Sequence, residues 1–482
     1  MTLETRADGL LQLPGDAVKA AAIAFIRIFL GVMWLFEVTV GHNWKIGGLA
    51  SGTNPAWLGP GVGDAVREET ASAIADGTYS WAAWAFDNII VPNAETFSYI
   101  VIALQILLGV AFIVGFAVRP LAVAALGLDV SIFMLGNSRI PPFFAAMHLF
   151  VLASGAGYYF GLDGWIMERT RQTKSGLVKA ARWLIDLPVF KRSYTPVAVA
   201  ALSLVGMFFF LTIVTRATPR FAMVAMDLAV LAGLAALGLW AADRYGDRIG
   251  SLTAMLRIFV GFKFLHEIWT RTSPGINALP GFAGVEAQSE VFNTIAANHW
   301  SLFGGLVDNL VLPAMGFWVV VFGVVQLTVG ASLLVGYRTR LMGSVGLLYV
   351  GGLIAFGMTR YAPFLFGLMI PVVALNGGRL ISLDRARGAV QRFGLPVPRR
   401  FVPVLIVVAA VNAVAAAATA FNVGITPDGY TDSMQSMVTA FVAIITGLLA
   451  LIGWLQNHPE LDHSVDAIPE GVHQQLSSIS IA

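Results

Sequence analysis

The chain has 482 residues, of which 57% are hydrophobic and only 12% are charged, and its formal net charge is +2. Soluble domains carry about 25% charged residues, so this composition, with a mean hydropathy of +0.76, excludes a water-soluble globular fold. The chain has no cysteine, which excludes disulfides, thiolate-bound metal clusters and covalently attached c-type haem.

Apolar runs of about 20 residues, the length that crosses a bilayer, recur along the whole chain. Each run must be helical because lipid offers no hydrogen bonds to the backbone. We therefore predict an all-α polytopic protein of the cell membrane with about twelve spans. Two of the runs, 120–137 and 340–357, are short enough to pack inside the bundle. The predicted spans are 18–40, 97–118, 120–137, 142–162, 195–215, 222–242, 252–270, 313–336, 340–357, 363–382, 402–422 and 435–455.

The first run follows a polar N-terminal segment, 1–17, and is too long for the core of a signal peptide, so we expect a retained span. The two longest loops are 41–96 and 271–312. Each ends in an aromatic, amphipathic stretch, Tyr79–Pro92 and Trp300–Pro313. Such stretches are typical of helices that lie along the membrane surface.

The distribution of Lys and Arg predicts the orientation of the spans. With the N-terminus inside, 20 of the 30 basic residues fall on the cytoplasmic side, mainly in 163–194 and 384–401. The outer loops then hold 7 and the span interiors hold 3. Because positive residues near spans favour the cytoplasm, we expect both termini to be cytoplasmic and the two longest loops to be outside.

An internal repeat is the most specific feature of the sequence. Arg27-Ile-Phe-Leu-Gly31 recurs 230 residues later as Arg257-Ile-Phe-Val-Gly261, and Glu37 recurs as Glu267. A second offset, of 221 residues, pairs Asp87, Asn88, Pro92, Gln105, Gly109, Gly115, Arg119, Arg139, Pro142 and Asp163 with Asp308, Asn309, Pro313, Gln326, Gly330, Gly336, Arg340, Arg360, Pro363 and Asp384. Six spans per copy is an even number, so the two copies are expected to be parallel, related by an axis along the membrane normal.

The repeated residues form a recognisable set of short motifs. The first helix of each copy carries an Arg and a Gly, with an acid near its outer end. The second helix ends in Gly-x-x-x-Arg at 115–119 and in Gly-x-Arg-x-Arg at 336–340, and a hairpin carries Arg-x-x-Pro at 139–142 and 360–363. This set resembles the DoxX/DoxD family over roughly 20–165 and 250–385. Gln105 and Gln326 stand where many members of that family carry an acid.

The resemblance implies two four-helix DoxX-like bundles, each followed by two additional helices. The boundaries are then 1–17 (cytoplasmic N-terminal segment), 18–165 (DoxX-like repeat 1), 166–194 (basic cytoplasmic linker), 195–245 (two additional helices), 250–385 (DoxX-like repeat 2), 386–401 (basic cytoplasmic linker), 402–456 (two additional helices) and 457–482 (cytoplasmic C-terminal tail).

In function, the resemblance implies a membrane subunit of a quinone-linked oxidoreductase, acting on thiosulfate or a related small oxyanion at the outer face. It implies quinone as cofactor and a partner membrane subunit, and we predict no metal and no nucleic-acid partner. A non-catalytic scaffold or assembly subunit is one alternative. A secondary transporter is another, because two parallel six-helix halves are also the plan of the major facilitator class. That class carries an acidic-Arg motif in the loop where this chain has 115–120, which lacks it.

Polar residues of both copies are expected near the outer face, where one Arg per copy and nearby acids would bind a small oxyanion through charge-assisted hydrogen bonds. The alternative interpretation is that these Arg and Glu residues pair to lock helix hairpins, because charges at membrane depth are usually paired. The candidate binding residues are Glu37, Asp87 and Arg139 in the first copy and Glu267, Asp308 and Arg360 in the second.

Other polar residues fall inside the spans. Arg27 and Arg257 must face the bundle and meet carbonyls, a carboxylate or a cofactor head group. Asp129 and Asp227 have no counterpart in the other copy, and each is a candidate for a proton relay or for a hydrogen-bonded structural acid.

Three further residues extend this polar set. Lys263 stands four residues before Glu267, which favours a pair within one helix. His148 and His266 are the two histidines within the spans, and we interpret them as packed polar residues rather than as haem ligands.

Overall fold

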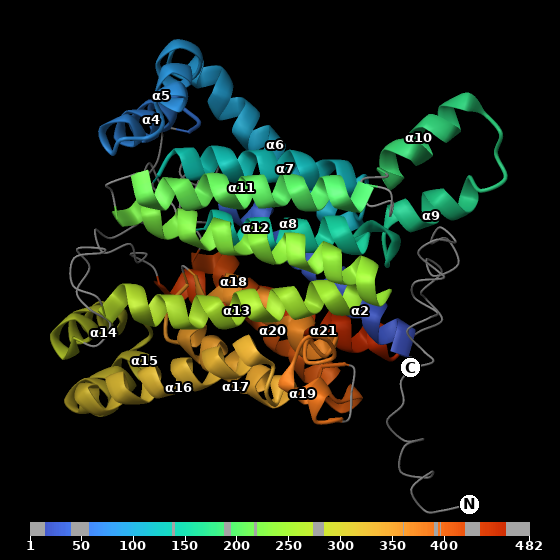
Figure 1. Ribbon diagram of the computed structural model, residues 1–482. Helices are drawn as coiled ribbons and strands as arrows, with labels where there is room; N and C mark the ends of the chain where they lie inside the picture. The colour runs from blue at the N-terminus through green and yellow to red at the C-terminus, as the bar shows by residue number, and fades with distance from the viewer. Residues whose placement is uncertain are drawn as a thin grey trace, which may run out of the picture.

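The computed structural model describes residues 15–39, 57–136, 140–187, 194–215, 219–272, 284–359, 361–389, 394–395, 397–419 and 434–458. Every regular element in these ranges is helical. All twelve predicted runs are helices, and most of them lie side by side as a bundle (Figure 1). They are α2 (Gly15–Thr39), α6 (Ala94–Val114), α7 (Val118–Met134), α8 (Pro141–Ser154), α11 (Thr195–Thr215), α12 (Pro219–Tyr245), α13 (Arg248–Thr272), α16 (Met315–Val335), α17 (Thr339–Ala355), α18 (Ala362–Ala374), α20 (Val402–Thr419) and α21 (Met434–Gln456).

Eight helical runs in the described part of the chain are long and apolar enough to cross a membrane. The protein is therefore a polytopic integral membrane protein. The other four of the twelve, α7, α8, α17 and α18, have only 13 to 17 residues. At about 1.5 Å per residue, none of these four crosses a hydrocarbon core of about 30 Å by itself.

The two stretches expected along the membrane surface are helical and continue into the helices that follow them. α5 (Ser80–Ala85) continues through a π-helical turn, η2 (Phe86–Ile90), and a 3-10 turn, η3 (Val91–Asn93), into α6. These elements form one candidate span of 35 residues. Pro92 has no amide hydrogen to donate, so the regular α-helical hydrogen bonds cannot continue through it. The π and 3-10 turns around Pro92 change the hydrogen-bond spacing and keep the run helical.

The second half of the chain has the same series of elements. α15 (Ser301–Leu306), the π turn η6 (Val307–Val311), the 3-10 turn η7 (Leu312–Ala314) and α16 form another run of 35 residues. Every element from α5 to α7 has an element of the same type and length beginning 221 residues later. This offset is the one at which the sequence repeats, so paired residues occupy matching positions in matching helices.

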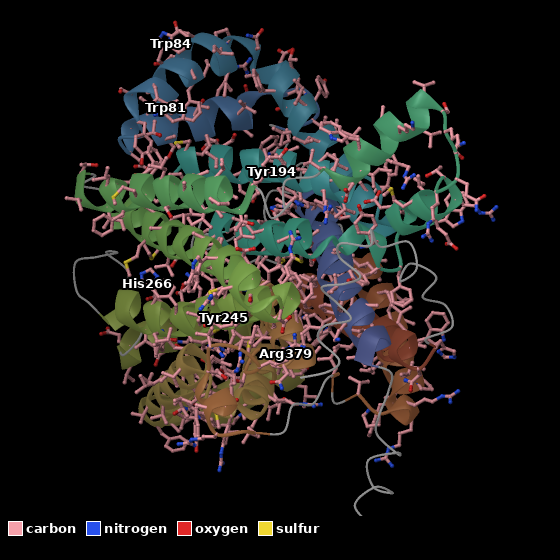
Figure 2. All side chains as sticks on the ribbon, turned by 45° about the vertical axis from the view of Figure 1, so that its right-hand side comes forward. Trp81, Trp84, Tyr194, Tyr245, His266 and Arg379 are labelled. Carbon is pink, nitrogen blue, oxygen red and sulfur yellow. The ribbon has the colours of Figure 1, made fainter. Side chains whose placement is uncertain are left out.

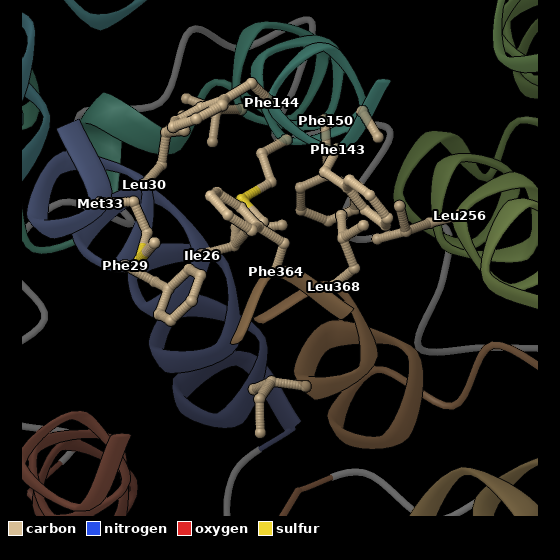
Figure 3. Close-up of a cluster of buried hydrophobic side chains, with 14 of the residues drawn as sticks. Ile26, Phe29, Leu30, Met33, Phe143, Phe144, Phe150, Leu256, Phe364 and Leu368 are labelled. Carbon is tan, nitrogen blue, oxygen red and sulfur yellow. The ribbon is translucent and has the colours of Figure 1, made fainter. Parts of the chain in front are cut away.

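The centre of the bundle is formed by α2, α8, α13 and α18. All residues of α8 except Leu149, and all residues of α18 except Leu365, are buried. Their Phe side chains meet residues of α2 in one apolar cluster (Figure 3). The expectation that α7 and α17 are the helices packed inside is wrong, because each exposes an apolar side, as at Val130 and Leu348.

The helix pairs α11–α12 and α20–α21 pack against helices from distant parts of the sequence. Besides its partner α11, α12 packs against α13 and touches α8, while α21 packs against α2 as well as against α20. Their neighbours α11 and α20 are mostly exposed and apolar, with Leu204 and Val414 each 71% exposed. Such faces belong against lipid, so α11 and α20 form part of the lipid-facing surface.

The bundle has two distinct ends (Figure 1). One end carries α4 (Asp64–Ala75), α5, α14 (Val285–Asn298) and α15, and we call it the loop end. The exposed side chains of Trp81 and Trp84 lie there (Figure 2). The other carries α9 (Leu162–Arg169), α10 (Gly176–Asp186) and α19 (Leu383–Ala386), and we call it the basic end. The two basic segments of the sequence thus lie at one end.

Arg27 and Arg257 hold the chain where it leaves α8 and α18. Arg27 Nη2 donates to the carbonyl of Phe160 at 3.0 Å, and Arg257 Nη2 donates to the carbonyl of Ile381 at 2.7 Å. Phe160 and Ile381 have φ values of 47° and 49°, in the left-handed region that non-glycine residues avoid. Both buried guanidiniums therefore meet backbone carbonyls, one of the expected partners, and stabilise an unfavourable turn.

Asp163 extends this arrangement in the first half, and we call Arg27, the Phe160 carbonyl and Asp163 together the clamp. Its carboxylate accepts the amide hydrogens of Ala117 at 2.7 Å and Val118 at 3.0 Å, which lie at the start of α7 and have no partner within the helix. Asp384 does the same for the first amides of α17, at 2.7 and 2.8 Å. Burial raises the pKa of Asp163 to about 6, and the two amide donors oppose that shift.

We expect Gly115→Ala to destabilise the protein. Gly115 has a φ of 73°, and a Cβ atom there would lie 1.5 Å from Nη1 of Arg27. The backbone strain and the displaced guanidinium together should lower the free energy of unfolding by about 2–4 kcal/mol. Thermal unfolding in mild detergent, followed by tryptophan fluorescence, measures the change.

Gly127→Ala is the matched control. An added Cβ at Gly127, inside α7, meets no heavy atom within 4 Å. Alanine also favours a helix over glycine by about 1 kcal/mol, so this variant should be at least as stable as the parent. Equal unfolding temperatures for Gly115→Ala and the parent would contradict the clamp.

Candidate functional site

Two buried polar clusters lie in the interior of the bundle. The first, which we call the Lys263 cluster, consists of Asp227 on α12 and Lys263, His266 and Glu267 on α13. The second, which we call the His148 triad, consists of Trp34 on α2, Asp129 on α7 and His148 on α8.

The Lys263 cluster is assembled by one face of α13. Lys263, His266 and Glu267 are spaced i, i+3 and i+4, so their side chains project from the same side of the helix. α12 packs against α13 and brings Asp227 to that side. The labelled His266 lies in the part of α13 that leads toward the loop end (Figure 2).

Hydrogen bonds and ion pairs join the four side chains. Nζ of Lys263 lies 2.6 Å from Oδ2 of Asp227 and 3.1 Å from Oε1 of Glu267. The second distance confirms the expected pair within the helix. Oδ1 of Asp227 lies 2.7 Å from Nδ1 of His266, so one carboxylate joins the ammonium and the imidazole.

Charged and titratable groups are concentrated in this cluster. The Lys263 ammonium contacts two carboxylates, and Asp227 and Lys263 are each only 1% exposed. Charges at membrane depth are costly unless they are paired, and these side chains pair with one another. Carboxylates and imidazoles are also the groups that take up and release protons in proteins.

The His148 triad is a continuous chain of hydrogen bonds. Nε1 of Trp34 donates to Nε2 of His148 at 3.1 Å. Because an indole nitrogen only donates, Nε2 carries no proton, and Nδ1 of His148 donates to Oδ2 of Asp129 at 2.7 Å. Both ring nitrogens of His148 are occupied by protein groups, so neither is available as a haem ligand. In the described part of the chain, Oδ1 of Asp129 has no hydrogen-bond partner.

Aromatic rings on α8 and α18 connect the two clusters through a series of contacts. Nζ of Lys263 lies 5.0 Å from the ring centroid of Phe143. Phe144 stacks on Trp34 at 4.4 Å, and Phe364 contacts both Phe143 and Phe144. Apolar phenylalanine side chains thus lie between the Lys263 cluster and the His148 triad.

Neither cluster occurs twice. At the positions that match Lys263 and His266, the first half has Met33 and Phe36. At the positions that match Trp34, Asp129 and His148, the second half has Phe264, Val350 and Met369. The expectation of one site in each half is therefore not met by these clusters, although the clamp arginines and aspartates do occur in both halves.

The predicted binding residues have different environments. Glu267 belongs to the Lys263 cluster, and Glu37 is partly buried in the last turn of α2. Asp87 and Asp308 are exposed on the two π turns. Arg139 and Arg360 lie outside the described residues.

The sequence did not predict that Trp34 contacts His148. It also did not predict that Asp129 and Asp227, the acids without a counterpart in the other half, each contact a histidine. A usable signal was present, because Asp129 and Asp227 are acids within spans that the other half lacks. No group of three or more Asp, Glu or His side chains in the described ranges is arranged to hold a metal ion. Comparison of the chain with protein-family models, with curated proteins and with solved structures finds no match.

We expect Lys263→Met to destabilise the protein by about 3–5 kcal/mol, because removing one partner leaves buried carboxylates without their ammonium. Adding Asp227→Asn to that variant removes a negative charge and keeps an acceptor for His266, so the double variant should recover part of the loss. Unfolding temperatures in mild detergent measure both effects.

Arg244→Met serves as the control, because Arg244 is exposed in the last turn of α12. Surface substitutions usually change stability by less than about 0.5 kcal/mol, so this variant should unfold with the parent. A Lys263→Met variant as stable as Arg244→Met would rule out a charged Lys263 cluster.

Proposed function

We propose that this protein is a proton-handling integral membrane subunit of a quinone-linked oxidoreductase. The observation that carries the proposal is the Lys263 cluster, in which two carboxylates contact one ammonium inside the bundle and an imidazole contacts one of these carboxylates. Reduction of a quinone consumes protons together with electrons. A membrane subunit that binds quinone needs groups that carry protons through an apolar interior, and buried carboxylates and histidines are such groups.

The proposed architecture is a duplicated one. Two parallel six-helix units, each with a four-helix DoxX-like bundle and two additional helices, account for the matching elements and for the two clamps around Arg27 and Arg257. In this arrangement the basic end is cytoplasmic and the loop end is outside. The Lys263 cluster then lies nearer the outer side, where it would exchange protons with the outer medium.

The proposed substrate is thiosulfate or a related small oxyanion, which the DoxX/DoxD resemblance suggests. It would approach at the loop end, and Arg139 and Arg360 are the cations that we propose for binding it, with Glu37 and Glu267 as their acidic neighbours. Electrons would pass to quinone in the membrane, with a partner subunit completing the enzyme.

A proton-coupled secondary transporter is the second candidate. Coupling sites of such transporters lie within the membrane between the two halves. The Lys263 cluster is placed in this way, because α12 and α13 come from different halves and Phe143 of α8 contacts Lys263. The clamps around Arg27 and Arg257 show that buried charges can also be structural. The support for an active role is that the Lys263 cluster joins two acids, an ammonium and an imidazole at one place.

The test compares wild-type protein, purified with its native partners and lipids in mild detergent, with an Asp227→Asn variant. We expect bound quinone in the organic extract of both proteins and thiosulfate-dependent quinone reduction by the wild-type preparation. Loss of a proton-handling group typically costs about 100-fold or more in rate, so quinone reduction should fall at least tenfold in Asp227→Asn. The variant's pH profile should also change.

Asp76→Asn is the control, because Asp76 is an exposed residue after α4 and should leave the rate and the pH profile unchanged. A preparation without quinone and without thiosulfate-dependent reduction would reject the oxidoreductase. Proton-driven uptake into proteoliposomes that depends on Asp227 would instead establish the transporter.

A further inference from the structure

α9 and α10 project beyond the helices of the bundle at the basic end (Figure 1). α10 is amphipathic. Leu177, Ala181 and Leu184, spaced i, i+4 and i+7, form an apolar stripe along one side, while Lys179 and Arg182 lie on the other. Leu177 is 84% exposed and Leu184 is 50% exposed, so the rest of the described chain does not cover the stripe.

The last turn of α10 is fixed to the transmembrane bundle. Nη1 of Arg119, at the start of α7, lies 2.6 Å from Oδ1 of Asp186, and the Tyr158 hydroxyl donates to the same oxygen at 2.7 Å. Ile185 is buried beside this contact. α10 is therefore attached where α7 begins, at the level at which the membrane face is expected.

The α9–α10 hairpin is strongly basic. In the segment 164–185, Glu168 is the acid, whereas the basic residues number five. The rings of Trp165 and Trp183 are 54% and 61% exposed, and tryptophan favours the boundary between lipid head groups and acyl chains. The basic residues are Arg169, Arg171, Lys174, Lys179 and Arg182.

We propose that the α9–α10 hairpin binds the phosphate head groups of anionic phospholipids on the membrane face at the basic end. The apolar stripe of α10 enters the head-group region, and the exposed basic residues between α9 and α10, Arg171 and Lys174, contact lipid phosphates. Positive charge, exposed tryptophans and attachment at the end of a span together favour a lipid surface over a protein partner. This binding site is independent of the proposed oxidoreductase activity.

The absence of cysteine makes a direct test available. Two full-length variants, Leu184→Cys on the stripe and Lys179→Cys on the opposite side, are each spin-labelled and placed in nanodiscs of phosphatidylcholine with or without phosphatidylglycerol. In anionic discs, we expect the Leu184→Cys label to be relaxed by oxygen and shielded from a water-soluble nickel chelate. The Lys179→Cys label should show the reverse, and neutral discs should shield the Leu184→Cys label less.

The dependence on charge is tested in the same labelled Leu184→Cys protein. Adding Arg171→Glu and Lys174→Glu, both exposed in the structure, should remove the extra shielding seen in anionic discs. Raising the salt concentration on the labelled parent should lower that shielding too, and this measurement needs no further variant to fold.

Two results would overturn the proposal. Equal access of nickel to the Leu184→Cys label in neutral and anionic discs would show that anionic lipid is not the ligand. Shielding that appears in native membranes but in neither type of disc would assign the stripe to a protein partner instead.

Discussion

Arg27 lies 0% exposed inside α2, with its guanidinium donating to the carbonyl of Phe160. Lipid cannot supply hydrogen bonds to a buried charge or to a broken helix end, so the protein must supply both. The clamp satisfies both groups at once, because the Phe160 carbonyl that accepts from Arg27 belongs to the turn that follows α8. Asp163 serves the opposite need by accepting the first amides of α7. The same solution appears in the second half at Arg257 and Asp384.

This constraint also explains why glycines stand where they do. Gly31 and Gly109 lie against each other's backbone, so α2 and α6 approach too closely for side chains. Gly115 and Gly336 have a different role, because their missing Cβ leaves space for the guanidiniums of Arg27 and Arg257. Gly109 thus allows two helices to pack closely, whereas at Gly115 a charged side chain, and not a helix, fills the space.

The sequence predicts the helices well and the sites poorly, for a physical reason. The length of an apolar run and its flanking charges are local properties, so all twelve helices are found, with starts such as Thr195 and ends such as Thr215 correctly placed. A buried cluster depends on which helices pack together. Asp227 lies 36 residues before Lys263, and only the packing of α12 on α13 joins them. The helical run through η2 was missed because Pro92 disrupts the local pattern.

The α12–α13 contact and the α21–α2 contact occupy corresponding places, but the side chains that meet at them differ in chemistry. Where α12 meets α13, His266 binds Asp227. Where α21 meets α2, Phe36, which matches His266, packs against Phe441 with ring centroids 4.5 Å apart. The apolar version holds its helices together without the cost of burying charge. Packing alone therefore gives no reason for the ion pairs at the α12–α13 contact. Their presence at only one of the two contacts supports the proton-handling role that we propose.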